Sequence, residues 1–419
     1  MQKLTTMFVL KKIHRWLGFP IGLIFLITFG TGFLTSIDEL LSRTAKLPQY
    51  SEPYQAPSLA QQAKAISHFE TQHKDIRQII LPTPSKPYYE VAQRGESFFY
   101  HLSSLEEIGH ETKSREGFFQ TVLQLHRNLL LGKEGFLGIK GAHYVAWVSL
   151  IALAISLLGI YIWWPLRRTF AWRDVLPQGT KRKNWYYSHM TAGIMSVAVI
   201  LMLALTGAAI TYRDVAKTVL GVNDKEKSPT QHATTLDNNW HSWLSHAHQN
   251  WPNSQIAYIQ FPRSAPAKGA ANNKSKADAA KIKNNKNPKQ NTNGNKSEGK
   301  QNQKTARTKG NSEAIVTLRL LTPQDWFGLP SSKVYINRKK SQVTGSDFFS
   351  ELSFGEKLYS IIVPLHTGRN LSAIYVAVLM LLSIIGTVMV LSGVVSFLQK
   401  KRKWKTQKLN FRFNKTVQS

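Results

Sequence analysis

Residues 13–37 read IHRWLGFPIGLIFLITFGTGFLTSI, and this stretch sets the fold of the whole chain. Its one full charge is Arg15, and a run of this length is sufficient to cross a bilayer, which needs about 20 apolar residues. His14 lies near its start, Gly18 follows four residues later, and Thr31-Gly32 follows at offsets 17 and 18. At about 100° per helical residue, the imidazole and both glycines share one face of the helix. The sequence therefore predicts a nitrogen ligand beside a helix surface that has no side chains.

The same pattern occurs a second time, 175 residues further along the chain, as His189, Gly193 and Thr206-Gly207. Each half of the chain then continues to a second histidine that precedes another apolar stretch. These histidines are His126 in the sequence LHRNL and His366 in the sequence LHTGRNL. The two halves are predicted to be parallel repeats, related by an axis along the membrane normal.

Four apolar stretches are predicted to span the membrane, namely 13–37, 144–164, 187–211 and 371–398. The short loop 165–186 is rich in Lys and Arg, and the positive-inside rule therefore places it and both termini in the cytoplasm. We expect a multi-pass protein of the bacterial inner membrane. Its remaining segments are predicted to be a cytoplasmic N-terminus at 1–12, a basic cytoplasmic tail at 399–419, and two periplasmic regions at 38–143 and 212–370.

The two periplasmic regions are predicted to be small α+β modules. Stretches 58–73 and 238–250 have the pattern of short amphipathic helices, and alternating apolar residues at 87–102 and 333–337 favour strands. Residues 264–311 contain twelve Lys or Arg, two acids and few apolar side chains. This composition is typical of disorder, so the second module is predicted to carry a disordered insert.

Charge and cysteine content limit the possible functions. The net charge of +30 is concentrated in the insert and in the tail, so we do not infer nucleic-acid binding from it. The chain has no cysteine, which excludes disulfides, iron–sulfur clusters and thioether-linked haem. Any haem in this protein must be held by side-chain ligation and packing alone.

The predicted topology sorts the histidines into two layers. His14 and His189 are expected to begin their helices at the cytoplasmic face, whereas His126 and His366 precede theirs on the outer face. Paired histidines at each end of a four-helix bundle are suited to two bis-imidazole haems. The glycines are expected to leave room for the rings, with Gly18 and Gly193 beside the inner one and Gly32 and Gly207 beside the outer one.

Each element also has a simpler interpretation. Glycine in a membrane helix often serves only close helix packing, and a histidine at a membrane boundary can form ordinary interfacial hydrogen bonds. The ligand hypothesis depends on the repetition of matched pairs at matched depths. His143, at the start of the second span, is an alternative or additional outer ligand to His126.

Taken in order, these motifs resemble the PepSY-associated transmembrane family of iron-regulated membrane proteins. The resemblance covers nearly the whole chain except 264–311 and the tail. It is carried by His14-Arg-Trp-Leu-Gly18, the Thr-Gly that follows, Leu125-His126-Arg127, Trp163-Trp164-Pro165 and Leu365-His366. It implies a mainly α membrane protein with a four-transmembrane-helix bundle and two PepSY-like periplasmic modules. It also implies b-type haem, two groups in all, on His14, His189, His126 and His366. The long insert and His143, where a basic residue is more usual, depart from the family pattern.

The resemblance implies a reductase that releases iron from a ferric siderophore or another ferric chelate in the periplasm. Arg127 and Arg369 are candidates to pair with haem propionates or with lipid phosphates. Because no Gly-rich dinucleotide fingerprint opens a βαβ unit, we expect the electron donor to be a membrane quinol or another redox protein. Two other classes stay open: a haem-free regulatory protein that binds through its PepSY-like modules, and a permease for iron or siderophore.

Overall fold

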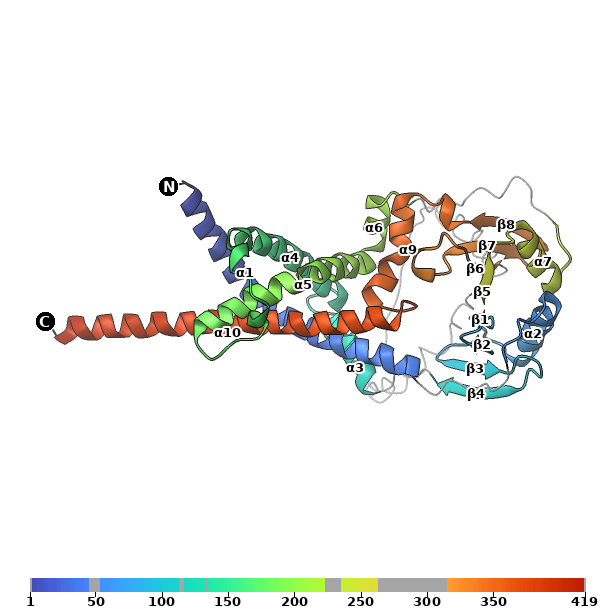
Figure 1. Cartoon of the computed structure of the whole chain (residues 1–419), viewed down its shortest axis with the longest axis horizontal. Coiled ribbons are helices and arrows are strands. Elements are labelled where there is room, and N and C mark those ends of the chain that lie inside the picture. Colours follow the sequence, from blue (N-terminus) through green and yellow to red (C-terminus); the bar gives the residue numbers. More distant parts are fainter. Residues whose placement is uncertain are drawn as a thin grey trace, which may run out of the picture.

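The computed structural model describes residues 2–44, 53–112, 117–132, 134–222, 235–262 and 315–417. The predicted disordered insert at 264–311 lies outside these residues. Figure 1 shows a bundle of long helices and, beside it, a sheet with helices packed on one face. Both termini lie at the end of the bundle that is opposite to the sheet.

Among the described residues, four helices are long and apolar enough to cross a membrane, as the sequence predicts. They are α1 (Gln2–Thr44), α4 (Gly141–Trp163), α5 (Arg182–Thr211) and α10 (Ala373–Val417). Their candidate membrane spans are Thr6–Arg43, Gly141–Thr169, Arg182–Thr211 and Ala373–Lys400. Two short 3-10 helices, η1 (Trp164–Thr169) and η2 (Trp172–Val175), connect α4 to α5.

The bundle places α1 and α5 at opposite corners. Both helices pack against α4 and α10, whereas α1 and α5 do not pack extensively against each other. Because α1 begins at Gln2 and α5 at Arg182, His14 and His189 lie within their helices. The expectation that these histidines begin their helices was therefore wrong. The diagonal arrangement leaves space between the two faces that carry them.

Three shorter helices complete the end of the bundle nearest the sheet, namely α3 (Phe118–Asn128), α6 (Arg213–Val219) and α9 (Phe354–Thr367). Helix α3 packs on α1 and α4, and α9 packs on α5. Helix α3 ends two residues after His126, and α9 ends one residue after His366. The residue that follows each helix, Leu129 or Gly368, adopts a left-handed conformation. These endings place His126 and His366 in the last turns of separate helices.

Eight antiparallel strands form one continuous sheet, in the order β4-β3-β2-β1-β5-β6-β7-β8. The two regions for which the sequence predicts α+β modules share this sheet, because β1 pairs with β5 and joins the halves edge to edge. The strands of the first half are β1 (Gln78–Ile80), β2 (Tyr89–Ala92), β3 (Glu96–Tyr100) and β4 (Glu107–Thr112). Those of the second half are β5 (Gln255–Gln260), β6 (Ile315–Leu321), β7 (Ser332–Asn337) and β8 (Gln342–Asp347).

Two helices cover one face of this sheet, α2 (Leu59–Gln72) and α7 (Trp240–Asn250). Both lie where the sequence predicts helices, and Ser58 begins α2 with a capping box. Their apolar faces form one core with alternate residues of the strands, including Phe69, Trp243 and Leu318. Figure 1 shows α2 and α7 on the side of the sheet away from the bundle, so the other face of the sheet is turned toward the bundle. The short helices η3 (Trp326–Gly328) and η4 (Phe349–Glu351) flank β7 and β8 in the sequence.

Candidate functional site

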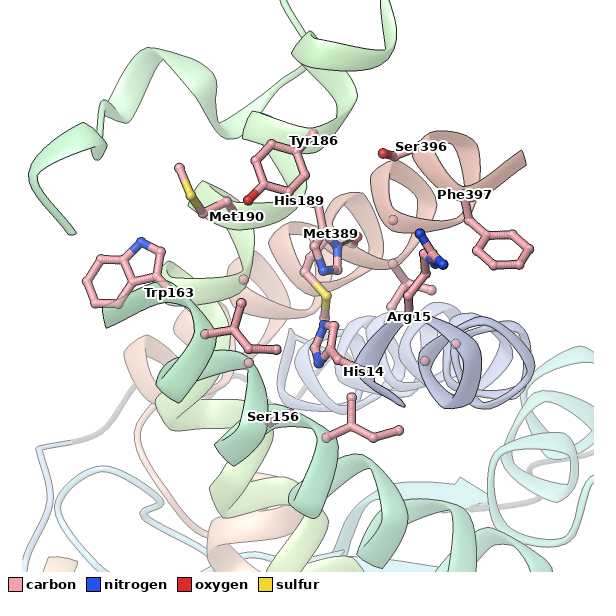
Figure 2. A pocket seen from close by; sticks show the side chains of 18 of the residues that line it. His14, Arg15, Ser156, Trp163, Tyr186, His189, Met190, Met389, Ser396 and Phe397 are labelled. Atoms are coloured by element: carbon pink, nitrogen blue, oxygen red, sulfur yellow. Dashed lines mark hydrogen bonds between the residues drawn. The ribbon is translucent and has the colours of Figure 1, made fainter. Parts of the chain in front are cut away.

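Two histidine pairs lie in the bundle, one above the other. The inner pair is His14 of α1 and His189 of α5, whose ring centroids are 6.1 Å apart with an interplanar angle of 62°. Figure 2 shows both side chains directed into the same cavity. The outer pair is His126 of α3 and His366 of α9, with centroids 6.2 Å apart at 49°. The structure therefore brings together all four histidines in the pairs predicted from the sequence.

The separation of each pair matches a metal ion bound between two imidazoles. A metal–imidazole nitrogen bond is about 2 Å long, and a ring centroid lies about 1.1 Å from its own nitrogen, so a linear arrangement separates the centroids by about 6 Å. The observed values are 6.1 and 6.2 Å. Among the described residues, no hydrogen bond joins the two imidazoles of either pair. Direct hydrogen bonding therefore does not account for the separation.

Hydrogen bonds at Nδ1 assign the protonation of three of the four rings. His189 Nδ1 lies 2.7 Å from the Met389 carbonyl oxygen, and His126 Nδ1 lies 3.0 Å from the Thr28 carbonyl oxygen. A carbonyl only accepts, so Nδ1 carries the proton and donates in both cases. Nε2 then keeps its lone pair, which is the form of imidazole that ligates a metal.

The contact with Thr206 assigns the proton of His366 to Nδ1 as well. Thr206 Oγ1 lies 2.7 Å from the Met202 carbonyl oxygen, to which it donates its only hydrogen, and 3.0 Å from His366 Nδ1. The hydroxyl is left to accept from Nδ1–H. Thr31 repeats this geometry, with 2.7 Å to the Ile27 carbonyl oxygen and 3.1 Å to His126 Nδ1. The Thr-Gly motifs thus contribute hydroxyl acceptors, a role that the sequence analysis did not assign.

His14 has a neighbour of the same kind as His189. The Ile155 backbone of α4 lies within hydrogen-bonding range of its imidazole, although the Nδ1 atom has no well-formed hydrogen bond among the described residues. Each ring of the inner pair therefore faces the backbone of a neighbouring helix, Ile155 of α4 for His14 and Met389 of α10 for His189.

Each imidazole is seated against a glycine of a neighbouring helix. A Cβ atom added to Gly32 would lie 3.5 Å from His126 Cε1, and one added to Gly207 would lie 3.1 Å from His366 Cε1. In the inner layer, a Cβ on Gly159 of α4 would lie 3.2 Å from His14 Cε1, and one on Gly393 of α10 would lie 2.7 Å from His189 Nδ1.

Gly32 and Gly207 therefore contact the outer imidazoles, although they were expected to flank a ring held between those imidazoles. The sequence analysis missed Gly159 and Gly393, because neither glycine belongs to the repeated histidine motif. Only the packing of α4 and α10 beside the histidine helices identifies them.

A cavity of about 380 Å³ adjoins the inner pair. Gly18 and Gly193 line it, together with apolar side chains such as Phe25 and Ile200. Gly18 has no neighbouring atom within 4 Å of an added Cβ, as expected for a surface left open for a ligand. Four cations from three helices also line this cavity, namely Lys11, Arg15, Arg182 and Lys400, and the described residues that line it include no Asp or Glu.

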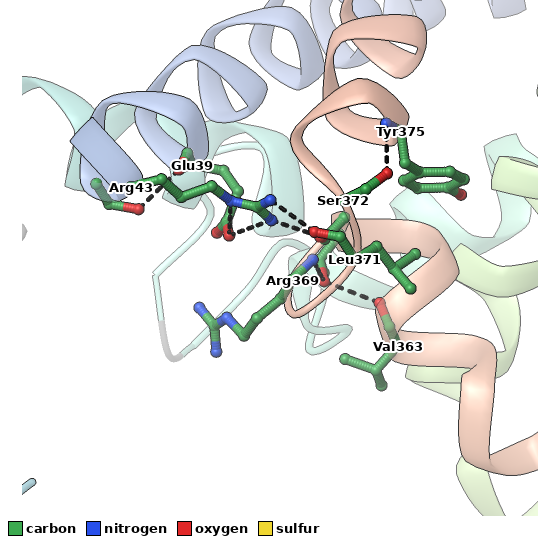
Figure 3. Close-up of polar contacts among 10 residues, drawn as sticks. Glu39, Arg43, Val363, Arg369, Leu371, Ser372 and Tyr375 are labelled. Carbon is green, nitrogen blue, oxygen red and sulfur yellow. Dashed lines mark hydrogen bonds and ion pairs between the residues drawn. The ribbon is translucent and has the colours of Figure 1, made fainter. Parts of the chain in front are cut away.

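Arg127 lies close to the outer pair. Burial lowers the pKa of His126 and lowers the pKa of His366 to about 4, and the charge of Arg127 lowers both pKa values further. Neutral imidazoles are the ligating form. Arg369 has an exposed side chain that extends away from the α9–α10 connection (Figure 3).

His143 is not part of either pair. Its Nδ1 atom lies 3.2 Å from the Tyr212 hydroxyl, and the two rings are 5.4 Å apart. His143 thus contacts Tyr212, and the outer pair consists of His126 and His366, as the repeated motif predicts.

Arg43 was not singled out by the sequence, yet it joins α1 to the α9–α10 connection. Its Nη1 donates to the Leu371 carbonyl over 2.6 Å, its Nη2 donates to the Gly368 carbonyl over 2.8 Å, and it pairs with Glu39 (Figure 3). This link holds the end of α9, and with it His366, beside α1.

Comparison with known protein families gives one match. A model of the PepSY-associated TM region matches residues 11–400, which includes both histidine pairs and the whole sheet. No curated protein matches the chain. The chain therefore belongs to the family of membrane proteins defined by the PepSY-associated TM region.

Proposed function

We propose that this protein binds two b-type haems, one at each histidine pair, and transfers electrons across the membrane to a ferric chelate on the side that bears the sheet. The observation that carries the proposal is the pair of imidazole separations, 6.1 and 6.2 Å, in two stacked layers. One such pair is compatible with chance packing. Two pairs with the same spacing, each seated on glycine, favour a common ligand.

The residues around the inner pair fit a flat, apolar group with two carboxylates. Glycines and apolar side chains would contact its faces, and Arg15, Arg182 and their neighbouring lysines would compensate its negative charge. When bound, the haem would supply reversible one-electron chemistry at each layer.

The protein's own groups would set the orientation and basicity of the ligands. The Met389 carbonyl and the Thr206 and Thr31 hydroxyls accept from Nδ1–H, which holds each ring in place and makes its Nε2 a stronger donor. Phe29, Ile200 and Val390 form a buried apolar cluster in the bundle. We assign the reductant to the quinol class, because a quinol is dissolved in the same bilayer that the four apolar helices would cross. One quinol gives two electrons and two protons and becomes a quinone, and two ferric chelates each accept one electron and become ferrous.

The visible absorption spectrum of the detergent-purified protein tests the haem proposal. We expect a Soret band and a pyridine haemochrome content of two haems per chain. Replacing both His14 and His189 with Ala, or both His126 and His366 with Ala, should lower the content to about one. His143→Ala is the matched control, because this histidine also lies at the outer end of the bundle but belongs to neither pair. A colourless protein, as expected of a regulatory protein or a permease, overturns the proposal.

Reoxidation tests the acceptor. The protein is reduced with dithionite, and the excess dithionite is removed under anaerobic conditions. The reduced protein is then mixed with a ferric chelate in the presence of a ferrous-specific dye. We expect the loss of one reduced haem for each ferrous ion trapped. Haem that stays reduced, while oxygen still oxidises it, would eliminate ferric chelates as the acceptor and leave the haem proposal standing.

A further inference from the structure

The face of the sheet turned toward the bundle carries a row of polar and aromatic residues. The strand register aligns Tyr258 of β5 with Arg319 of β6, Arg319 with Lys333 of β7, and Lys333 with Asp347 of β8. These residues alternate along their strands with buried core residues such as Leu318 and Val334. They therefore project from the face opposite to α2 and α7.

This face is partly accessible in the second half of the sheet. Tyr258, Arg319 and Lys333 are all half-buried, whereas their core-facing neighbours are buried. On the same face of the first half, Glu90, Ser97 and Phe99 are buried, whereas Gln78 and Ile80 of β1, the strand next to β5, are half-buried. The partly accessible region therefore covers β5–β8 and continues onto β1.

Arg319 is a half-buried cation without a carboxylate partner among the described residues. Its Nε and Nη2 atoms lie 3.4 Å from the Gln260 Oε1 atom, and its guanidinium lies 5.9 Å from the centre of the Tyr258 ring. Hydrogen bonds of this length are weak, and an amide oxygen carries no net charge to compensate the cation. A partly desolvated guanidinium gains most from an anion with adjacent oxygens, because its donors form a planar fork.

Tyr335, next to Arg319 on the same face, is held as a neutral phenol. Burial raises its pKa, the charge of Asp347 raises it further, and its hydroxyl donates to Asp347 Oδ2 over 2.9 Å. The Tyr335 ring therefore offers an aromatic surface rather than a second anion. With Tyr258, it places two aromatic rings beside one cation.

We propose that this face of β5–β8 is the docking site for the ferric chelate, and that it selects chelates of the catecholate class. The inference rests on the proposed function, which requires a chelate on this side of the bundle. A ferric tris-catecholate is an anion that carries aromatic rings with adjacent oxygens, so Arg319 would bind its oxygens and Tyr258 and Tyr335 would stack against its rings. A tris-hydroxamate lacks the negative charge, and a citrate complex lacks the rings. Figure 1 shows that the sheet face opposite to α2 and α7 looks toward the end of the bundle that carries α3 and α9, the helices of the outer pair.

Redox-inert gallium(III) complexes test the docking site separately from electron transfer. Calorimetric titration of the full-length protein would compare gallium(III) tris-catecholate, made from 2,3-dihydroxybenzoate, with gallium(III) tris-acetohydroxamate and gallium(III) citrate. We expect the catecholate complex to bind at least about tenfold more tightly than either of the others, as one or two charge-assisted contacts provide. Equal affinity for all three complexes, or no binding, overturns the inference.

Three substitutions locate the site. Arg319→Gln should weaken catecholate binding about tenfold, and Arg319→Lys, which keeps the charge but loses the fork, should weaken it less. Lys340→Gln removes the same charge from an exposed position in the β7–β8 turn and should leave affinity unchanged. Equal losses in Arg319→Gln and Lys340→Gln would show a general charge effect and overturn the assignment.

The two proposals fail in different ways. Haem-loaded protein that does not bind the gallium catecholate refutes the docking site alone. Colourless protein that binds it refutes the haem proposal alone.

Discussion

The Thr31 hydroxyl oxygen lies 3.1 Å from Nδ1 of His126, and the Thr206 hydroxyl repeats the contact with His366 at 3.0 Å. Each threonine is followed by the glycine that seats the same imidazole. One dipeptide in each half therefore contacts an outer histidine twice, with the hydroxyl at its Nδ1 atom and the glycine at its Cε1 atom. The two halves of the chain share this geometry.

Removing one of these hydroxyls should weaken the outer site selectively. We expect Thr31→Val to lower the haem affinity of the outer site about tenfold, since partners that orient a metal ligand have typical effects of about 10- to 100-fold. It should also shift the midpoint potential of one haem and leave the other unchanged. A spectroelectrochemical titration measures both quantities.

Thr35→Val is the control for that substitution. Its hydroxyl donates to the Gly32 carbonyl within α1 and contacts no histidine. If the two variants show the same potentials, Thr31 has no role at the outer site.

Substitution of Gly393, the glycine that contacts His189, should prevent haem binding at the inner pair. In Gly393→Ala the new methyl carbon would lie 2.7 Å from His189 Nδ1, so the ring or α10 must move, at a cost of about 1–3 kcal/mol. We expect the haem content to fall toward one per chain. Gly30→Ala, where no atom lies within 4 Å, should retain two. Full occupancy in Gly393→Ala would show that the contact between Gly393 and His189 is unimportant.

Arg43→Met should loosen the joint between α1 and α9. The substitution removes two hydrogen bonds from a charged donor to the Leu371 and Gly368 carbonyls, for which about 1.5–3 kcal/mol each is typical. We expect a lower temperature of haem loss, measured by absorbance during heating. Arg369→Met, at an exposed side chain, should change that temperature little. An unchanged value in Arg43→Met would contradict the proposed joint.

Arg338→Gln should weaken the contact between α2 and α7. Arg338 pairs with Glu70 of α2 and lies over the rings of Trp240 and Trp243 of α7, at 5.4 and 5.7 Å from their centres. We expect a loss of about 1 kcal/mol in the stability of the sheet region. The rate of proteolysis of the sheet with α2 and α7 under native conditions would measure this loss of stability. Lys340→Gln is the control. Equal cleavage rates would show that these contacts contribute nothing.

Local pattern was enough to predict the spans and the histidine pairs, because both depend on spacing along one helix. The four apolar helices and helices α2 and α7 lie where hydrophobic periodicity places them. The pairing of His126 with His366 follows from the match between the two halves of the chain.

The remaining features depend on contacts between distant elements. The β1–β5 pairing joins Gln78 of the first half of the chain to Gln260 of the second half, and no local pattern predicts it. Gly159 and Gly393 become recognisable only when α4 and α10 are packed beside the histidines. Arg43 donates hydrogen bonds to backbone carbonyls more than 300 positions away. Because every residue has a backbone carbonyl, no residue type in the sequence identifies these partners.

Each histidine pair draws one ring from the first half of the chain and one from the second, His14 with His189 and His126 with His366. Neither half contains a complete pair, so a fragment ending before α5 holds only unmatched rings. The same division runs through the sheet, where β1 and β5 meet. Binding of the proposed haems would therefore require assembly of the two halves, and a half-chain that dimerised with a copy of itself would build each pair from two identical histidines.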